Sequence, residues 1–280
     1  MKLASIQLDG KHVWGRVEGD EIIIPDKAFL HRHPCLKSAL ADGELSMLQE
    51  VRESARIPVA EAVFEPLIPD PGRVICVGIN FKAHMKEMQR DEPEHPWLFV
   101  RWGDSQVGHG QPLIAPSVSE KYDFEGELAV VIGKQAHRVK AVDALDYVAG
   151  YTCFMDGSVR DWQRHSTQFT PGKNFYASGS FGPWLVTADE IPDPAKLNLQ
   201  TRLNGEVMQE APISDLKFDV PTLIEYCSTF AKLQPGDVIS TGTPGGVGFA
   251  RKPPVWLKDG DTLEVEVDGI GVLSNPVVAE

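Results

Sequence analysis

The sequence predicts an α+β protein that is rich in β-strands, with a small N-terminal α+β domain at residues 1–68 and a larger domain at residues 69–280. Three observations support this prediction. Short segments rich in Val, Ile and Leu recur along the chain, separated by Gly and Pro, as strands are. Few stretches repeat apolar residues with the period of a helix. Pro66, Pro69 and Pro71 mark a linker between the two domains.

The N-terminal domain alternates in short pieces. Strands are expected at residues 2–8, 13–17 and 21–24. Residues 36–53 carry apolar side chains at roughly helical spacing, which predicts a helix. Strands beside a helix give this part of the chain its α+β assignment.

The larger domain opens with an apolar strand at residues 73–79. Further strands are expected at residues 127–132, 147–155, 184–187, 197–203, 238–241 and 262–267. The best helical pattern of this domain covers residues 221–233. The domain is therefore expected to be mostly sheet with a small share of helix.

Composition and charge exclude several classes of function. The formal net charge is -13, and no cluster of Lys and Arg offers the basic face that a nucleic acid requires. No apolar run is long enough to span a membrane, and residues 1–20 lack the pattern of a signal peptide. The four cysteines are scattered, as in a reduced protein. We therefore expect a cytoplasmic protein with no nucleic-acid or membrane partner.

Three carboxylates form the most informative motif. Glu125 and Glu127 are two residues apart on a predicted strand, so their side chains point to the same face. Asp156 ends another apolar strand. Buried carboxylates are costly unless they are paired or bind a metal, and a hard cation such as Mg²⁺ prefers oxygen ligands. Each part has a simpler explanation, because exposed strands carry such Glu pairs and an Asp before Gly is often a turn residue.

His84 and Glu87 form a second candidate site. Their spacing of three places both side chains on one face of a short helix after the strand. A His that is oriented by a carboxylate can act as a general base toward water. A surface pair on a solvated helix explains the same spacing, and the spacing alone favours that explanation.

Two further segments carry groups that can bind anions. Arg160 and Lys173 can bind the carboxylate or oxyanion groups of a substrate, although surface ion pairs explain them equally well. Residues 241–248 form a Gly-rich loop whose backbone amides can approach an anion closely. The loop is neither a P-loop nor a dinucleotide-binding fingerprint, and a tight connection between strands is its simpler explanation.

Taken together, six segments in this order resemble the fumarylacetoacetate hydrolase family. They are V-G-I-N-F-K-A-H-M-K-E (77–87), D-F-E-G-E-L-A-V-V-I-G (123–133), F-M-D-G-S-V-R-D-W-Q (154–163), G-K-N-F (172–175), F-G-P-W-L-V-T (181–187) and S-T-G-T-P-G-G-V-G (240–248). The resemblance covers about residues 70–280, and the short N-terminal domain resembles that of small bacterial members of the acylpyruvate hydrolase branch.

This resemblance implies a mixed β-roll in the C-terminal domain, a homodimer and one divalent cation per subunit, usually Mg²⁺ or Mn²⁺. Ca²⁺ is a further candidate for this cation, since it also accepts carboxylate ligands. The implied metal ligands are Glu125, Glu127 and Asp156, and the implied catalytic pair is His84 and Glu87. The implied substrate contacts are Arg160, Gln163, Lys173 and Thr243, with Lys173 also stabilising negative charge in the reaction.

The chain departs from the commoner family pattern at three positions. Arg101 stands where many members have Lys, and it offers a wider, bidentate fork for a substrate. Tyr176 stands where many members have Asp, and Met155 where many have Asn. The metal ligands are unchanged by these departures, which bear on the identity of the substrate.

The expected function is metal-dependent hydrolysis of a carbon–carbon bond in a small 1,3-diketo acid, such as an acylpyruvate. Glu87 orients His84, which activates a water, and the cation draws charge from the developing enolate as a Lewis acid. On the same site, decarboxylation of a β-keto acid such as oxaloacetate, or isomerisation or hydration of an unsaturated keto acid, is the alternative. A structural metal site and a sugar-binding β domain are the alternatives from other classes.

Overall fold

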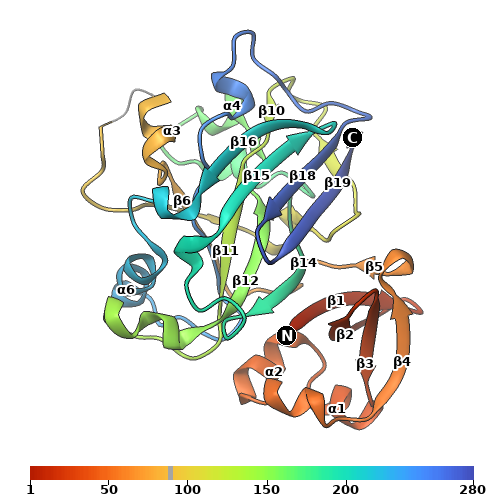
Figure 1. Ribbon diagram of the computed structural model, residues 1–280. Coiled ribbons are helices and arrows are strands. Elements are labelled where there is room, and N and C mark those ends of the chain that lie inside the picture. Colours follow the sequence, from red (N-terminus) through yellow and green to blue (C-terminus); the bar gives the residue numbers. More distant parts are fainter. Residues whose placement is uncertain (88–90) are drawn as a thin grey trace.

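The computed structural model describes residues 1–87 and 91–280. Most of the ordered structure is β-sheet, and helices are short (Figure 1). The α-helices of the described residues are α1 (Lys27–Arg32), α2 (Leu36–Asp42), α3 (Lys82–Glu87), α4 (Arg160–Gln163), α5 (Thr170–Lys173) and α6 (Val220–Phe230). Short 3₁₀ turns lie at Leu45–Gln49, Val59–Glu61, Gly103–Ser105, Ala141–Tyr147, Pro194–Lys196, Ile213–Asp215 and Gly248–Ala250. This architecture confirms the predicted β-rich α+β class.

The N-terminal strands build one end of the largest sheet. They are β1 (Lys2–Leu8), β2 (Lys11–Glu18), β3 (Glu21–Pro25), β4 (Glu53–Pro58) and β5 (Val63–Phe64). In Figure 1 they form a lobe with α1 and α2 at one side of the molecule. Lys2 and Leu3 of β1 pair with Val186 and Leu185 of β14 (Gly179–Thr187), so the lobe shares a sheet with the rest of the chain. The domain boundary at residue 68 stays a prediction.

One predicted element of the lobe is wrong. A single helix was expected over residues 36–53, but α2 ends at Asp42 and β4 begins at Glu53. Gly43 follows α2 with a φ of 69°, in the left-handed region that glycine adopts without steric cost. Its backbone N–H caps the carbonyls of Ala39 and Leu40. The helical spacing of apolar residues therefore extends past residue 43, although the helix itself does not.

The remaining strands of the largest sheet hold the site. They are β6 (Val74–Gly78), β7 (Trp97–Arg101), β8 (Gln106–Val107), β11 (Gly126–Ile132), β12 (Val148–Met155), β14 and β17 (Val238–Ser240). The order across the sheet is β4-β3-β2-β1-β14-β12-β11-β17-β6-β7, with β5 and β8 attached to β1 and β14. Predicted strands that are far apart along the chain thus pair side by side in this sheet.

A second sheet covers one face of the first. Its order is β16-β15-β18-β19-β9, with β16 (Glu206–Pro212), β15 (Asn198–Leu203), β18 (Thr262–Val267), β19 (Gly271–Ala279) and β9 (Leu113–Ala115). A small pair joins β10 (Tyr122–Asp123) to β13 (Ser158–Val159). Figure 1 shows β15, β16, β18 and β19 lying across β11 and β12. The two layers enclose the core of the larger part of the chain.

Strand β11 is buried on both faces, as its apolar sequence predicts. Leu128 and Val130 pack into the core between the two sheets, whereas Ala129 and Val131 pack into a core shared with the N-terminal lobe.

No helix in the described part of the chain is both long and apolar enough to cross a lipid bilayer.

Candidate active site

The three predicted carboxylates converge at one end of β11 and β12. Glu125 directly precedes β11, Glu127 lies within it and Asp156 directly follows β12. The antiparallel pairing of the strands brings them together, and the Asp156 N–H donates to the Glu125 carbonyl at 2.8 Å. One carboxylate oxygen from each residue lies within 4.8 Å of the others, and all three side chains are buried. Their burial excludes the simpler explanation that Glu125 and Glu127 are a Glu pair on an exposed strand.

Gly126 allows the second sheet to pack directly behind the two glutamates. A Cβ at this position would lie 2.0 Å from Thr201 Oγ1 and 3.3 Å from Val265 Cγ1. The Gly126 N–H donates to Gln209 Oε1 at 3.0 Å. The alternation of a strand turns Glu125 and Glu127 to the opposite face, away from this tight contact.

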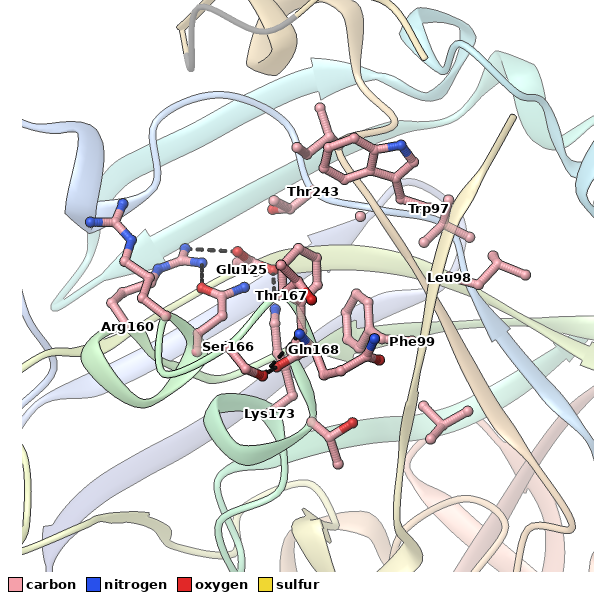
Figure 2. Close-up of a pocket in the computed structure, with 18 of the residues that line it drawn as sticks. Trp97, Leu98, Phe99, Glu125, Arg160, Ser166, Thr167, Gln168, Lys173 and Thr243 are labelled. Carbon is pink, nitrogen blue, oxygen red and sulfur yellow. Dashed lines mark hydrogen bonds and ion pairs between the residues drawn. The ribbon is translucent and has the colours of Figure 1, made fainter. Parts of the chain in front are cut away.

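Buried cations hold two of the carboxylates. Lys173 Nζ lies 2.7 Å from Glu125 Oε2 and 2.7 Å from Asp156 Oδ2. Arg160 Nη2 lies 2.7 Å from Glu125 Oε1 and 2.8 Å from Asp123 Oδ2. Figure 2 shows Glu125 joined to Arg160 and Lys173. Burial opposes ionisation of Glu125, yet Lys173 and Arg160 outweigh it and hold its pKa at about 2.

Glu127 has no cation beside it in the described residues. It accepts hydrogen bonds from the Ser240 hydroxyl at 2.5 Å and from the Gly242 N–H at 2.8 Å. Burial raises the pKa of Glu127 well above its usual range, and the charges of Asp156 and Glu125 raise it further. No ion pair among the described residues offsets a negative charge on Glu127, so the metal-free site favours the neutral form of this side chain.

Arg101 lies behind the cluster and not at a cavity wall. Its Nη1 donates to Asp156 Oδ1 at 2.7 Å and to the Gly157 carbonyl at 2.8 Å, and its Nη2 donates to Ser178 Oγ at 2.9 Å. The side chain is fully buried. Its predicted contact with substrate therefore has no support from the geometry, which instead makes Arg101 a clamp on Asp156.

Replacing Arg101 by Met is expected to lower the free energy of unfolding by about 3–5 kcal/mol, because Asp156 then keeps a buried charge with one partner fewer. The matched control is Arg56→Met, whose ion pairs with Glu21 and Glu53 are exposed and screened by solvent, so their loss should change stability far less. Denaturant unfolding of both metal-free variants measures the difference. Equal losses for the two would contradict the clamp.

His84 and Glu87 form the predicted pair on α3. His84 Nδ1 lies 2.9 Å from Glu87 Oε2, and the His84 ring is buried. The Gly246 N–H donates to Glu87 Oε1 at 3.0 Å, which ties the helix to the Gly-rich loop. Burial opposes ionisation of Glu87, but the His84 and Gly246 hydrogen bonds lower its pKa. The pair thus joins a buried ring to a carboxylate that is still partly exposed to solvent.

A cavity of about 890 Å³ opens in front of these groups. The predicted residues that line it are His84, Glu125, Glu127, Arg160, Gln163, Lys173 and Thr243. Trp97, Leu98 and Phe99 form an apolar wall across from Arg160 and Glu125 (Figure 2). A volume of this size is typical of a small-molecule site with a few convergent polar groups.

The Thr243 hydroxyl is already committed within the protein. Thr243 Oγ1 donates to the Gly126 carbonyl at 2.9 Å and accepts from Gln209 Nε2 at 2.7 Å. A hydroxyl has one proton and two lone pairs, so one lone pair remains. Thr243 is therefore set to accept a hydrogen bond from a molecule in the cavity.

Comparison with known proteins agrees with this arrangement. Residues 73–278 match the protein family described as fumarylacetoacetate (FAA) hydrolase C-terminal. The chain belongs to the fumarylacetoacetate hydrolase family. It is an enzyme of that superfamily, and the match contains the carboxylate cluster, the His84–Glu87 pair and the cavity.

Relatives within the family carry different activities in their names. The human mitochondrial oxaloacetate tautomerase FAHD2A is 43% identical over 245 residues, which are 85% of this chain and 78% of that protein. The 5-carboxymethyl-2-hydroxymuconate delta-isomerase of Mycobacterium smegmatis superposes over 100% of both chains, with a TM-score of 0.81 and 33% identity. The maleylpyruvate hydrolase of Sphingobium sp. SYK-6, in complex with manganese(II) ion and pyruvate, covers 100% of this chain and 99% of its own, with a TM-score of 0.82 and 31% identity.

The residues of the family site suit a divalent cation. Four buried carboxylates (Asp123, Glu125, Glu127 and Asp156) face three buried cations (Arg101, Arg160 and Lys173), so one negative charge is in excess. The candidate ligands offer only oxygen atoms, which hard divalent cations prefer. Glu127 is the carboxylate that gains most from such a charge, because it forms no ion pair with any residue that the structure describes.

The family site also contains residues that the sequence reasoning missed. Asp123 accepts hydrogen bonds from Arg160 and from the N–H groups of Gly248 and Phe249. It stands two residues before Glu125, so the same alternation that indicated the glutamates was a usable signal. The apolar wall at residues 97–99 and the cavity residues 164 and 166–170 had no such signal, because only the fold brings them to the site.

Proposed function

We propose that this chain is a divalent-metal-dependent enzyme that interconverts the keto and enol forms of a small 2-oxo dicarboxylic acid such as oxaloacetate. The observation that carries the proposal is the position of His84, which lines the same cavity as Glu125 and Glu127 and is held by Glu87. Enolisation requires a base beside a group that favours negative charge on the neighbouring oxygen. The name of the human relative supports oxaloacetate.

The proposed metal ligands are Glu125, Glu127 and Asp156. We propose Mg²⁺ as the cation, with Mn²⁺ as an accepted substitute and Ca²⁺ as a third candidate. When bound, the cation supplies positive charge that favours the enolate form of the oxo acid. Ser240 and the Gly242 N–H hold Glu127 in place for this role.

His84 is proposed as the group that moves the proton. Its Nδ1 faces the ionised Glu87, so Nδ1 carries the hydrogen and Nε2 offers a lone pair to the cavity. Nε2 accepts a proton from carbon 3 of the keto form and donates it to the oxygen on carbon 2, which gives the enol. The same two transfers in the opposite order restore the keto form. Glu87 stabilises the imidazolium that forms between these two steps.

Lys173 is proposed to stabilise the negative charge of the substrate. Two of its three protons are donated to Glu125 and Asp156, and one remains for a ligand in the cavity. The raised pKa of Lys173, which Asp156 and Glu125 bring about against the effect of burial, keeps the amine protonated. Arg160 and Gln163 are proposed to position the substrate from the adjoining wall.

Hydrolysis of an acylpyruvate is the second candidate, as expected for the bacterial acylpyruvate hydrolase branch. The His84–Glu87 pair can activate a water as readily as it accepts a proton from carbon. The cavity of about 890 Å³ also exceeds what a four-carbon acid fills. The name of the Sphingobium relative supports this reading.

Three reactions followed in parallel test the proposal. Metal-stripped protein receives Mg²⁺ and is mixed with enol oxaloacetate, whose absorbance decays as it converts to the keto form. Pyruvate release from oxaloacetate and loss of diketo absorbance from acetylpyruvate are measured on the same protein. We expect Mg²⁺-dependent acceleration of the enol decay above the other two rates. Faster loss of acetylpyruvate would assign the chain to the hydrolases, and faster pyruvate release would assign it to the decarboxylases.

We also propose that the enzyme is a homodimer, as the family resemblance implies. Strand β7 is an edge of the largest sheet, and Trp97, Val100 and Trp102 on or beside it are 43%, 46% and 55% exposed. Exposed apolar groups on a sheet edge are suited to a protein interface. The mass in solution tests this proposal against the 30.8 kDa of one chain. Cytoplasmic location stays a prediction.

A further inference from the structure

Arg164 carries a charge that the described protein leaves without a partner. It lines the cavity, and its side chain is exposed. No hydrogen bond or ion pair joins its guanidinium to any residue within 1–87 or 91–280. Arg160, by contrast, is paired with Asp123 and Glu125 and donates to Gln163 Oε1 at 3.1 Å. Among the described residues that line the cavity, Arg164 is therefore the guanidinium that has no ion pair with a carboxylate of the protein.

The Arg164 side chain is nevertheless held in position. Its Cζ lies 4.2 Å from the centre of the Phe249 ring, a cation–π contact that leaves the edge of the guanidinium open. The Phe249 N–H donates to Asp123 Oδ2 at 3.0 Å, and Arg160 Nε donates to the same oxygen at 2.8 Å. Asp123 thus positions Arg160 directly and Arg164 through the Phe249 ring.

The loop that carries Phe249 fits tightly against Asp123. The Gly248 N–H donates to Asp123 Oδ1 at 2.8 Å, and a Cβ at Gly248 would lie 2.6 Å from that oxygen and 1.9 Å from the Val255 carbonyl oxygen. Only glycine allows this approach. The ring beneath Arg164 is therefore placed by the same carboxylate that orients Arg160.

The separation of Arg160 and Arg164 indicates how long a ligand the site can hold between them. Arg160 begins α4 and Arg164 follows its last residue, four positions later. Residues four apart in a helix lie on the same face, about 6 Å apart along the axis. Arg160 borders the metal ligand Glu125, so Arg164 lies one turn further along the wall. A short chain with an acidic group at each end matches this separation.

We propose that Arg164 binds the second carboxylate of the substrate and selects dicarboxylic 2-oxo acids over monocarboxylic ones. The proposal rests on the proposed function in one respect, namely that the 2-oxo acid end lies at Glu125, Glu127 and Asp156. The guanidinium donates two parallel N–H···O bonds to the distal carboxylate, a geometry that Lys cannot reproduce. Neutral side chains nearby, such as Ser166 and Gln168, offer no charge for this purpose.

A matched ligand pair tests the proposal without turnover. 2-Oxoglutarate and 2-oxopentanoate have the same number of carbons and differ in the distal carboxylate, which is a methyl group in the second. Calorimetry measures the affinity of both for Mg²⁺-loaded wild type, Arg164→Gln and Arg164→Lys. The control is Arg32→Gln, because Arg32 is exposed and stacks on Phe29 at 5.5 Å outside the cavity.

We expect Arg164→Gln to lose about 10- to 100-fold in affinity for 2-oxoglutarate, the usual effect of hydrogen bonds to a charged group, and less than about threefold for 2-oxopentanoate. Arg164→Lys should recover part of the loss, and Arg32→Gln should bind both ligands as wild type does. Equal losses for both ligands, or none for either, would overturn the proposal.

The outcome is separable from that of the proposed function. Arg164-dependent selection in a wild type that does not tautomerise oxaloacetate would refute the proposed reaction and leave the dicarboxylate site in place. If the wild type tautomerises oxaloacetate and Arg164→Gln has the same KM for oxaloacetate, the dicarboxylate site is refuted and the proposed reaction stands. KM is the informative constant, because Arg164 is proposed to bind substrate and not to move its proton.

Discussion

Replacing Glu127 by Gln is expected to remove divalent-cation binding and to reduce kcat/KM by more than about 100-fold, beyond the range typical for groups that only support a metal ligand. Among the described residues, Glu127 is the carboxylate of the cluster that forms no ion pair, whereas Lys173 serves both Glu125 and Asp156. The substitution keeps the size of the side chain and removes its charge. Calorimetry with Mg²⁺ and with Mn²⁺ measures the loss directly, apart from any activity.

The same substitution should stabilise the metal-free protein above acidic pH. The pKa of Glu127 is raised in the folded state, so its contribution to stability is present below its unfolded value of about 4.3 and is lost as the pH rises through the folded value. Metal-free Glu127→Gln lacks this penalty. Saturating Mg²⁺ should then raise the melting temperature of wild type only, by several degrees for about 3 kcal/mol of binding free energy.

Glu206→Gln is the matched control for Glu127→Gln. Glu206 begins β16 at an exposed position, so its loss removes the same charge without touching the cluster. We expect wild-type Mg²⁺ affinity and activity from it. If Glu127→Gln itself retained wild-type Mg²⁺ affinity, Glu127 would not be a metal ligand.

Replacing His84 by Gln is expected to lower kcat by about 10²- to 10⁴-fold while Mg²⁺ affinity stays within about twofold of wild type. His84 lines the cavity but is no part of the carboxylate cluster, so it can be removed without loss of a proposed metal ligand. Glu87→Gln should cost less, because the ring and its nitrogen remain and only its orienting charge is lost. Steady-state kinetics with each substrate, beside Mg²⁺ calorimetry, separates the two effects.

The control for this prediction is His31→Gln, an exposed histidine on α1 outside the cavity. It should leave both constants unchanged. Unaltered kcat in His84→Gln would remove His84 from the reaction. A parallel fall in Mg²⁺ affinity would instead mean that His84 helps to hold the cation.

The position of the carboxylate cluster was predictable because it depends on local rules. The alternation of a strand turns Glu125 and Glu127 to one face, and a buried apolar strand follows them. The pairing of β11 with β12 then brings Asp156 to the same end, as antiparallel register allows. The N-terminal strand β1 was likewise visible in the sequence from end to end. The helix over residues 36–53 failed at Gly43, where backbone conformation outweighed apolar spacing.

Other features depend on contacts between residues far apart in sequence. Arg101 has the residue type of a substrate-binding group, but burial turned it toward Asp156 and away from the cavity. The sequence could not separate proton transfer at carbon from attack by water, because both proposed reactions would use the same His84–Glu87 pair.

By itself, then, the sequence determined the β-rich α+β class, the family and the residue types of the cluster, because strand alternation and motif order act over a few neighbouring residues. Only the tertiary structure decided which charges are compensated. It pairs Arg160 with Asp123 and Glu125. Within residues 1–87 and 91–280 it gives Glu127 no ion pair, and it places Arg164 exposed at the cavity. The reason is physical: the energy of a charge depends on its burial and on its partners, and both are set by strands and loops that meet only in the folded chain.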